Sequence, residues 1–245
     1  MEMVPTENGL LGGRVRLLQP ARGYRVAVDA VLLAAAVDAA SGQHVLDLGA
    51  GVGAVGLCLA ARVPGCNIVG IELQAGLAAL ATRNAALNGA GDHLRTIVHD
   101  IAGPLPPDLV SPDLVGFDHV VTNPPYLAAA VADPSPDPSK ALATVESSAD
   151  LARWLSVATG ALKPTGTLTV IHRSDRLEEI VDHLTRLGWG DVMLKRLPPA
   201  ARVLVRARFG APARRESPPL RLHRPEGGYT DEAEAILRHA QPLAF

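Results

Sequence analysis

The stretch Val45-Leu46-Asp47-Leu48-Gly49-Ala50-Gly51-Val52-Gly53 decides the fold of this chain. Residues 44–48 form a short apolar run that predicts a buried strand, and residues 54–62 predict the helix that follows it. The glycines between them permit a tight turn and let a ligand approach the backbone at the junction of strand and helix. Such a junction indicates a parallel α/β sheet with a ligand site at the carboxyl ends of its strands.

Strands and helices alternate along the rest of the chain, which predicts an α/β fold with a doubly wound, mostly parallel, seven-stranded sheet of the Rossmann-like type and an antiparallel closing strand. The expected strands are 44–48, 67–72, 94–99, 117–122, 166–172, 192–196 and 203–209, and the expected helices are 26–40, 54–62, 73–88, 147–162 and 175–187. We divide the chain into an N-terminal segment and helix that pack on the cofactor site (1–42), a core (43–210) and a basic C-terminal extension ending in a helix (211–245).

Composition and charge exclude several classes of protein. The 245 residues are 48% hydrophobic and 20% charged, so the chain can bury a sizeable core. Its net charge of −2 argues against a protein that coats nucleic acid non-specifically. Two cysteines and scattered histidines predict neither a disulfide framework nor a metal site. The N-terminus lacks a signal-peptide pattern and segment 26–40 is too short to span a bilayer, so we expect a cytoplasmic protein without membrane contact.

Three acidic residues follow successive strands at one expected edge of the sheet. Asp47 stands beside the glycine turn, Glu72 ends the second strand and Asp100 follows the third. The glycine spacing together with Glu72 also fits a dinucleotide site, which keeps NAD as a candidate cofactor. A carboxylate beside the turn would repel a pyrophosphate but attract a cationic group, and Asp100 is placed for an adenine amino group. The three acids therefore favour S-adenosylmethionine, which has a sulfonium and an amine but no phosphate.

The tetrapeptide Asn123-Pro124-Pro125-Tyr126 directly follows the expected strand 117–122. Two consecutive prolines have no N–H donors and restrict the backbone, so they predict a stiff elbow at the end of this strand. An amide acceptor, free carbonyls and an aromatic ring suit a flat substrate with an NH2 group. We assign the catalytic roles to Asn123 and Pro124, whose oxygens would accept the two N–H bonds of the amine, and to Tyr126, which would stack on the ring.

The glycine motif, Glu72, Asp100 and the tetrapeptide, in this order, resemble the amino methyltransferases, which methylate nitrogen conjugated to a planar system. Two further segments, 23–33 (with Gly23-Tyr24-Arg25 and Asp29-Ala30-Val31-Leu32-Leu33) and 222–230, resemble the bacterial tRNA adenine-N6 methyltransferases. That family acts on adenosine 37 beside the anticodon of a valine tRNA. The resemblance implies a class I methyltransferase fold, tRNA as partner, and S-adenosylmethionine bound by Tyr24, Asp29, Asp47, Gly49, Gly51, Gly53, Glu72, Leu73, Asp100, Ile101 and Asn123.

Three alternatives to this function stay open. A protein-glutamine N5-methyltransferase uses the same tetrapeptide on release factors or ribosomal proteins, although such enzymes usually have a helical domain ahead of the first strand. A DNA or ribosomal RNA adenine-N6 methyltransferase is the second, and these often add a recognition domain. The third is a non-catalytic module that binds a nucleotide cofactor, against which the elbow argues. The proline-rich loop 127–145 matches no family pattern and leaves the exact substrate open.

A basic segment lies near the C-terminal end of the chain. From Lys195 to Arg224 there are nine Lys or Arg residues and a single acid, Glu216. This charge suits a localised contact with a polyanion, and a base in an RNA loop can leave its stack at the lowest cost. The candidates for RNA contact are Arg202, Arg206, Arg208, Arg214, Arg215, Arg221 and Arg224.

Overall fold

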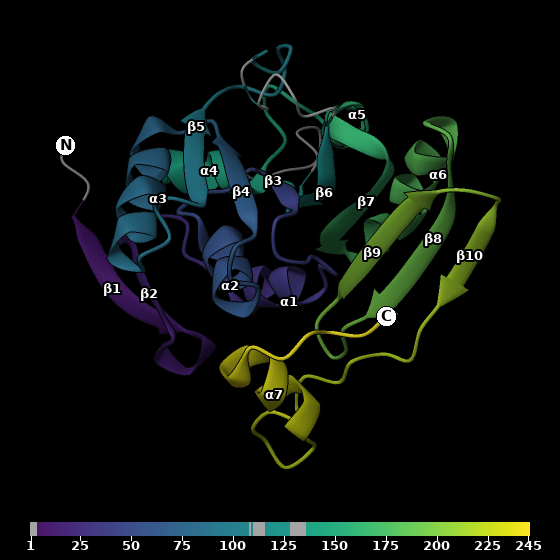
Figure 1. The fold of residues 1–245 in the computed structure, drawn as a ribbon. Coiled ribbons are helices and arrows are strands. Elements are labelled where there is room, and N and C mark those ends of the chain that lie inside the picture. The colour runs from purple at the N-terminus through teal and green to yellow at the C-terminus, as the bar shows by residue number, and fades with distance from the viewer. Residues whose placement is uncertain (1–3, 108, 110–115, 128–135) are drawn as a thin grey trace.

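One mixed sheet of eight strands forms the centre of the structure (Figure 1). The computed structural model describes residues 4–107, 109, 116–127 and 136–245. The sheet order is β10-β8-β9-β7-β6-β3-β4-β5, and β9 runs antiparallel to both of its neighbours. The strands are β3 (His44–Leu48), β4 (Asn67–Glu72), β5 (Leu94–Val98), β6 (Phe117–Thr122), β7 (Leu162–Arg173), β8 (Trp189–Arg196), β9 (Arg202–Phe209) and β10 (Ala213–Glu216).

The order of the strands places a topological switch point between β3 and β6. The chain builds from β3 outward through β4 to β5 and then returns to form β6 on the other side of β3. Loops that leave β3 and β6 in opposite directions open a crevice at the carboxyl ends of these two strands. The glycine turn follows β3 and the Asn-Pro-Pro-Tyr elbow follows β6, so both motifs lie at this crevice.

The doubly wound α/β fold with an antiparallel strand is confirmed, but the expected number of seven strands was wrong. The additional strand β10 pairs in parallel with β8 at the edge of the sheet. Its four residues, Ala213-Arg214-Arg215-Glu216, are all exposed. An edge strand that buries no side chain has no apolar alternation, so only the backbone pairing reveals it.

Helices cover both faces of the sheet. On one face, α1 (Val28–Ala35), α2 (Ala54–Arg62), α3 (Ala75–Leu87) and α7 (Asp231–His239) share a core with alternate residues of β3, β6, β7 and β9. On the other face, α5 (Leu151–Ala161) and α6 (Leu177–Arg186) pack on the intervening residues of the same strands. Val120 and Val121 show this alternation, because they are neighbours in β6 yet belong to opposite cores.

An N-terminal hairpin, β1 (Pro5–Leu10) and β2 (Val15–Pro20), forms a second, two-stranded sheet beside α3 (Figure 1). Our expectations for segment 1–42 included only a helix. The side chain of Asn84 accepts from Leu18 N at 2.7 Å and donates to Leu18 O at 2.9 Å, and Asn88 makes the same pair of bonds with Arg16 at 2.8 and 2.7 Å. Two amides one helical turn apart thus satisfy the free edge of β2 as a neighbouring strand would.

Several other expected elements differ from the structure in their bounds. Strand β7 begins at Leu162 and β8 at Trp189, each a few residues earlier than expected, and α5 begins at Leu151 rather than at 147 because Asp150 caps it. Helix α1 begins at Val28 and ends at Ala35, which is shorter than the expected helix 26–40. The loop expected over 127–145 contains helix α4 (Pro138–Thr144), which begins with Asp137 as its cap and proline at its first position. Pro134 lies outside the described residues. A bridge between Leu127 and Val145 closes this segment at its base. Among the described residues, no helix is long and apolar enough to cross a membrane.

Candidate active site

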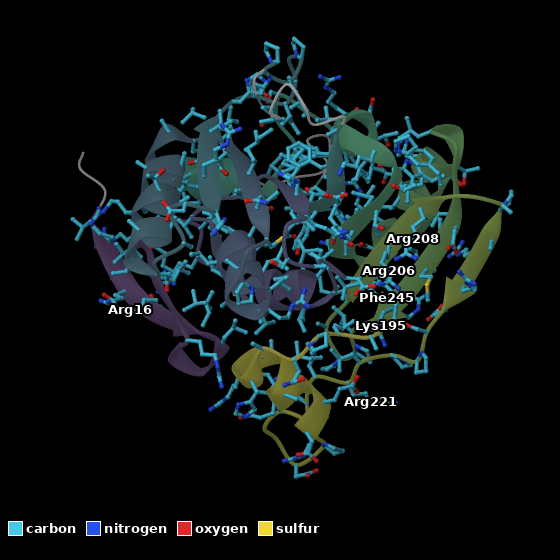
Figure 2. The ribbon with its side chains drawn as sticks, viewed as in Figure 1. Arg16, Lys195, Arg206, Arg208, Arg221 and Phe245 are labelled. Atoms are coloured by element: carbon cyan, nitrogen blue, oxygen red, sulfur yellow. The ribbon has the colours of Figure 1, made fainter. Side chains whose placement is uncertain are left out.

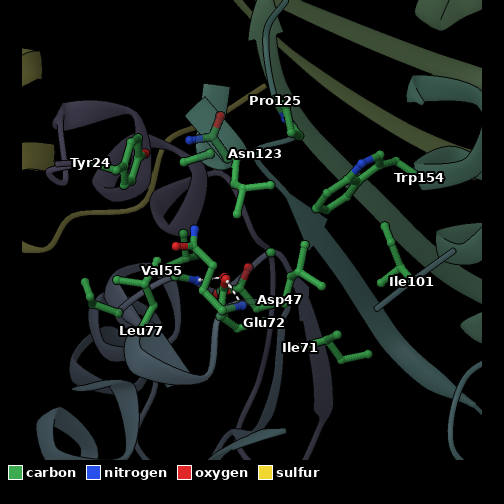
Figure 3. Close-up of a pocket in the computed structure, with 18 of the residues that line it drawn as sticks. Tyr24, Asp47, Val55, Ile71, Glu72, Leu77, Ile101, Asn123, Pro125 and Trp154 are labelled. Carbon is green, nitrogen blue, oxygen red and sulfur yellow. Dashed lines mark hydrogen bonds between the residues drawn. The ribbon is translucent and has the colours of Figure 1, made fainter. Parts of the chain in front are cut away.

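A cavity opens at the switch point, where the loops after β3, β4, β5 and β6 meet. Figure 3 shows Asn123 and Pro125 on one side of it, the acids Asp47 and Glu72 on another, and Trp154 along a third. Most of the expected cofactor-binding residues line this cavity: Tyr24, Asp47, Gly49, Gly51, Glu72, Leu73, Asp100, Ile101 and Asn123. Expected cofactor-binding residues that are up to 99 positions apart in the sequence (Tyr24 to Asn123) thus meet at one edge of the sheet.

The glycine turn shapes the floor of the cavity. Gly49 has a φ of +77°, and a Cβ built at this position would lie 2.7 Å from Cη2 of Trp154. Any side chain here would therefore be strained twice, by the left-handed backbone and by the indole above it. Gly53 has another role, because it caps the start of α2 at a φ of +83° and approaches Ala81 of α3. It does not line the cavity.

Two buried carboxyl groups face the cavity from the ends of β3 and β4. Asp47 is 2% exposed, and its Oδ2 has no hydrogen-bond partner among the described residues. Burial and, after it, the nearby Glu72 raise the pKa of Asp47 to about 7. Glu72 accepts hydrogen bonds from the backbone N–H groups of Gly51 and Gln74, each at 2.8 Å, and burial raises its pKa as well. The site therefore concentrates negative charge that lacks a counterion within the described chain.

A third carboxyl group and apolar side chains line the end of the cavity nearest β5. Asp100 Oδ1 accepts hydrogen bonds from Ala102 N and from the Ser148 hydroxyl, both at 2.9 Å. Leu73 is 40% exposed at the cavity and Ile101 is buried beside it. Trp154 of α5 adds its indole face, and its Nε1 has no partner among the described residues. A flat ligand with a polar edge fits between such groups.

The elbow holds a buried acceptor without a partner at the wall of the cavity. Asn123 Oδ1 is buried and has no hydrogen-bond partner among the described residues. Below the elbow, His172 is fully buried and its Nε2 lies 3.4 Å from the Pro125 carbonyl oxygen, to which it donates. Burial lowers the pKa of His172 to about 4, so the imidazole is neutral at physiological pH. The fold thus fixes one carbonyl of the elbow and leaves the Asn123 amide oxygen available.

Tyr126 and Asp29 lie beside the cavity rather than in its wall. The Tyr126 hydroxyl donates to Asp29 Oδ2 at 2.7 Å, and Arg202 Nε donates to the same oxygen at 3.2 Å. The Arg202 guanidinium also lies 4.4 Å from the centre of the Tyr126 ring, and His172 contacts the ring edge-on at 5.1 Å. Burial and the neighbouring Asp29 raise the pKa of Tyr126. Tyr126 is therefore a neutral, fixed ring with one face covered by an arginine.

The expected RNA-binding arginines do not form one surface. Four of them pair with acids: Arg202 with Asp29, Arg214 with Glu178, Arg215 with Asp191 and Arg224 with Asp231. Among the described residues, Arg206, Arg208 and Arg221 have no such ion pair. Arg206 and Arg208 extend from β9, whereas Arg221 lies near α7 (Figure 2).

Several residues of the cavity wall were not expected from the sequence. Trp154 lies on an amphipathic helix, where a tryptophan is ordinarily assigned to the core. Leu142 and Ala143 belong to α4, which reaches the cavity through a hydrogen bond from Gln74 Nε2 to Ser139 O at 3.3 Å. These residues follow a proline-rich segment without helical periodicity.

This sheet order, with a glycine turn, an acidic rim and an Asn-Pro-Pro-Tyr elbow at the switch point, defines a class I methyltransferase, a class whose methyl donor is S-adenosylmethionine. Residues 25–184 match the methyltransferase small domain, and the chain belongs to that family. A crystal structure of a predicted O-methyltransferase from Agrobacterium tumefaciens has a similar fold, with a TM-score of 0.69 and 25% identity over 88% of this chain and 98% of that one.

Two curated relatives illustrate the range of the similarity. The chain is 34% identical over 163 residues to a tRNA1(Val) (adenine(37)-N6)-methyltransferase of Porphyromonas gingivalis, and the aligned region covers 64% of this chain and 61% of the relative. It is 35% identical over 152 residues to a release factor glutamine methyltransferase of Deinococcus radiodurans, covering 60% and 51%. The similarity to the Porphyromonas gingivalis protein thus spans about three fifths of that relative's length.

Proposed function

We propose that this protein is an S-adenosylmethionine-dependent methyltransferase that methylates the exocyclic N6 of an adenine in RNA, namely adenosine 37 in the anticodon loop of a tRNA. The observation that supports this most is the Asn123 amide oxygen. Asn123 lines the cavity, and its amide oxygen is buried with no hydrogen-bond partner among the described residues. A buried acceptor without a donor is costly unless a ligand supplies one, and an exocyclic NH2 group is such a donor.

The cavity residues fit the cofactor. When bound, S-adenosylmethionine supplies an electrophilic methyl group. Asp47 would face its cationic groups, Glu72 its ribose hydroxyls and Asp100 its adenine amino group, with Leu73 and Ile101 against the adenine ring. Tyr24, Gly49, Gly51 and the newly identified Trp154 complete the wall. Asp29 and Gly53, which lie outside the cavity wall, act through other residues: Asp29 holds Tyr126, and Gly53 starts α2.

At the elbow, Asn123 Oδ1 and the Pro124 carbonyl would accept the two N–H bonds of the target amine. An exocyclic adenine amine is a poor nucleophile because its lone pair is delocalised into the ring. Two acceptors favour a pyramidal nitrogen and strengthen as positive charge develops in the transition state, which is where binding increases the rate. Tyr126 would stack on the base with the face opposite Arg202. A neutral Tyr126 and a neutral His172 leave no strong base at the elbow, and none is required, because the amine can lose its proton after transfer.

The substrate assignment rests on the relatives and on the residues of the elbow. The Porphyromonas gingivalis relative is named for adenosine 37 of a tRNA, and segments 23–33 and 222–230 resemble that family on both sides of the core. The Deinococcus radiodurans relative favours a second candidate, a glutamine amide in a release factor, because a primary amide offers the same two N–H donors. We assign the chemistry and the substrate-binding elbow to residues 43–210 and one side of the cofactor cavity to residues 1–42.

The test is a comparison of substrates. Purified protein is incubated with methyl-labelled S-adenosylmethionine and, in parallel, with unmodified total tRNA, a release factor and duplex DNA. We expect label in tRNA, recovered as N6-methyladenosine after digestion to nucleosides. Asn123→Ala should abolish transfer while cofactor affinity stays within about twofold of the wild type. Label in the release factor alone would replace our proposal by glutamine methylation, and label in no macromolecule would refute both.

A further inference from the structure

Part of the sheet is covered by helices on one face only. In β9, Val203, Val205 and Ala207 are buried in the core under α5 and α6. The residues between them point to the opposite face, where Leu204 packs in the core with α1 and α7. Arg206 and Arg208 continue this face beyond that core. Figure 2 shows both arginines with Phe245 over β8 and β9, and they lie on the face that α5 and α6 do not cover.

Two polar rows cross this face. Thr167 of β7 lies opposite Arg208 of β9 and opposite His119 of β6, and Thr169 lies opposite Arg206. Thr169 is 1% exposed and His119 is 6% exposed. The Thr169 hydroxyl and Nδ1 of His119 are nevertheless buried without hydrogen-bond partners among the described residues. A sheet face that is only solvated rarely buries polar atoms without partners beside two arginines.

The two arginines are fixed in position but not neutralised. The Arg206 guanidinium lies 4.3 Å from the centre of the Phe245 ring, and its Nη2 lies 3.7 Å from Met193 Sδ. Arg208 Nε donates to the Thr167 hydroxyl at 3.2 Å. Neither forms an ion pair with a carboxylate of the described chain. Guanidinium groups held by an aromatic ring and a hydroxyl keep donors free for an oxyanion at low entropic cost.

The geometry points to a docking site for the phosphate backbone of RNA, formed by Arg206 and Arg208 with the Thr167–Thr169 rows beside them. This inference rests on the proposed RNA substrate. Strand β9 begins at Arg202, which pairs with Asp29 beside the elbow. Six residues of a strand span about 20 Å, so Arg208 lies about that far along β9 from the elbow. An RNA whose target base enters the elbow can therefore place a neighbouring backbone segment on this face.

A matched pair of double variants tests this docking site. Arg206→Gln with Arg208→Gln removes the two unpaired charges. Arg214→Gln with Arg215→Gln removes two charges of the same sheet that are paired with acids of α6 and β8. Binding of an unmodified tRNA transcript is measured by fluorescence anisotropy between 50 and 300 mM salt. Arg208→Gln alone, at an exposed position, serves if the first double variant fails to fold.

The site predicts a difference between the two variants. Loss of two phosphate contacts should weaken tRNA binding about tenfold at 100 mM salt and reduce the slope of log affinity against log salt by about 1.4–1.8. The Arg208→Gln variant should show about half that change in slope. The control pair should change affinity less than twofold. An equal loss in both pairs, or an unchanged slope, would overturn the inference.

The experiment separates this inference from the proposed function. Methyl transfer to tRNA by the wild-type protein tests the function itself and does not depend on either pair of variants. If the wild type methylates tRNA and the Arg206/Arg208 variant binds it with the wild-type salt dependence, the function stands and the docking site is refuted. If the wild type methylates only a release factor, the proposed function fails first and this inference fails with it.

Discussion

Replacing Asp47 by asparagine should stabilise the cofactor-free protein above neutral pH and, at the same time, weaken its binding of S-adenosylmethionine. Burial, followed by the charge of Glu72, raises the pKa of this carboxyl group from 3.8 to about 7. Between these two values the folded protein binds more protons than the unfolded chain. The free energy of unfolding therefore falls as the pH rises through this range, by up to about 4 kcal/mol at pH 8.

Asparagine has the shape of aspartate without its charge and so avoids this loss. The advantage of Asp47→Asn should increase by about 2–3 kcal/mol from pH 5, where the wild-type carboxyl is protonated, to pH 8. For a chain of this size the difference in Tm between variant and wild type should widen by about 5–10 °C over that range. Thermal unfolding of the cofactor-free proteins at pH 5, 6.5 and 8 measures it. A variant that is less stable at pH 8, or a difference that does not change with pH, would refute the reasoning.

Once the Asp47 carboxyl group is ionised, it should attract the cationic cofactor. Because half of the Asp47 groups are protonated near pH 7 in the free protein, the wild-type Kd should be about tenfold larger at pH 6 than at pH 8 from this group alone. Titration of the cofactor itself affects both proteins equally, so the ratio of the variant Kd to the wild-type Kd isolates Asp47. Calorimetric titration should show this ratio rising about tenfold from pH 6 to pH 8. A constant ratio would mean that Asp47 does not face the cation.

Three other substitutions test the cavity floor, the elbow and the hairpin. Gly49→Ala should destabilise the protein by more than Gly51→Ala in chemical denaturation, because both glycines have positive φ (a strain of about 1–2 kcal/mol) but only the first would also meet Trp154; equal losses would contradict the contact. Tyr126→Phe should keep the KM for RNA, whereas Tyr126→Ala should raise it by roughly 5- to 150-fold if the ring stacks on the base; equal KM values would exclude stacking. Asn84→Ala removes three hydrogen bonds, two of them to the hairpin, and should lower the free energy of unfolding by about 2–4 kcal/mol. Hydrogen exchange over residues 5–20 should increase in this last variant, and unchanged protection would show that packing alone holds the hairpin.

Much of the fold could be predicted from local patterns. The bounds of β3, β4 and β6 agree with the expected strands residue for residue, because each is a short apolar run that ends at a glycine, an acid or the elbow. The hairpin, β10 and α4 were not predicted as elements. The side chains of β1 and β10 are largely exposed and α4 follows prolines, so these three elements have no periodic apolar signal, whereas β2 alternates buried and exposed residues. Backbone pairing and contacts with distant residues such as Asn84 form them instead.

The candidate site divides in the same way. The residue types of the site can be predicted from the sequence alone. The glycines, the acids and the elbow stand at strand ends, and the carboxyl ends of parallel strands meet at one edge of the sheet. The burial of these residues cannot be predicted from the sequence alone, although it decides their chemistry. Asp47 acquires its raised pKa from the protein around it, and Asn123 becomes an unpaired acceptor only because the fold surrounds it without a donor.

The sequence by itself determined the class of this protein, because the strands, the glycine turn, the acidic rim and the elbow each correspond to a short contiguous motif and follow one another in a fixed order. Only the tertiary structure decided which arginines are free to bind a partner. Arg214 and Arg215 meet acids from α6 and β8, whereas Arg206 and Arg208 share one open face of β9. The sequence shows which residues are charged. Whether a charge is neutralised depends on neighbouring residues that only the folded chain brings within reach.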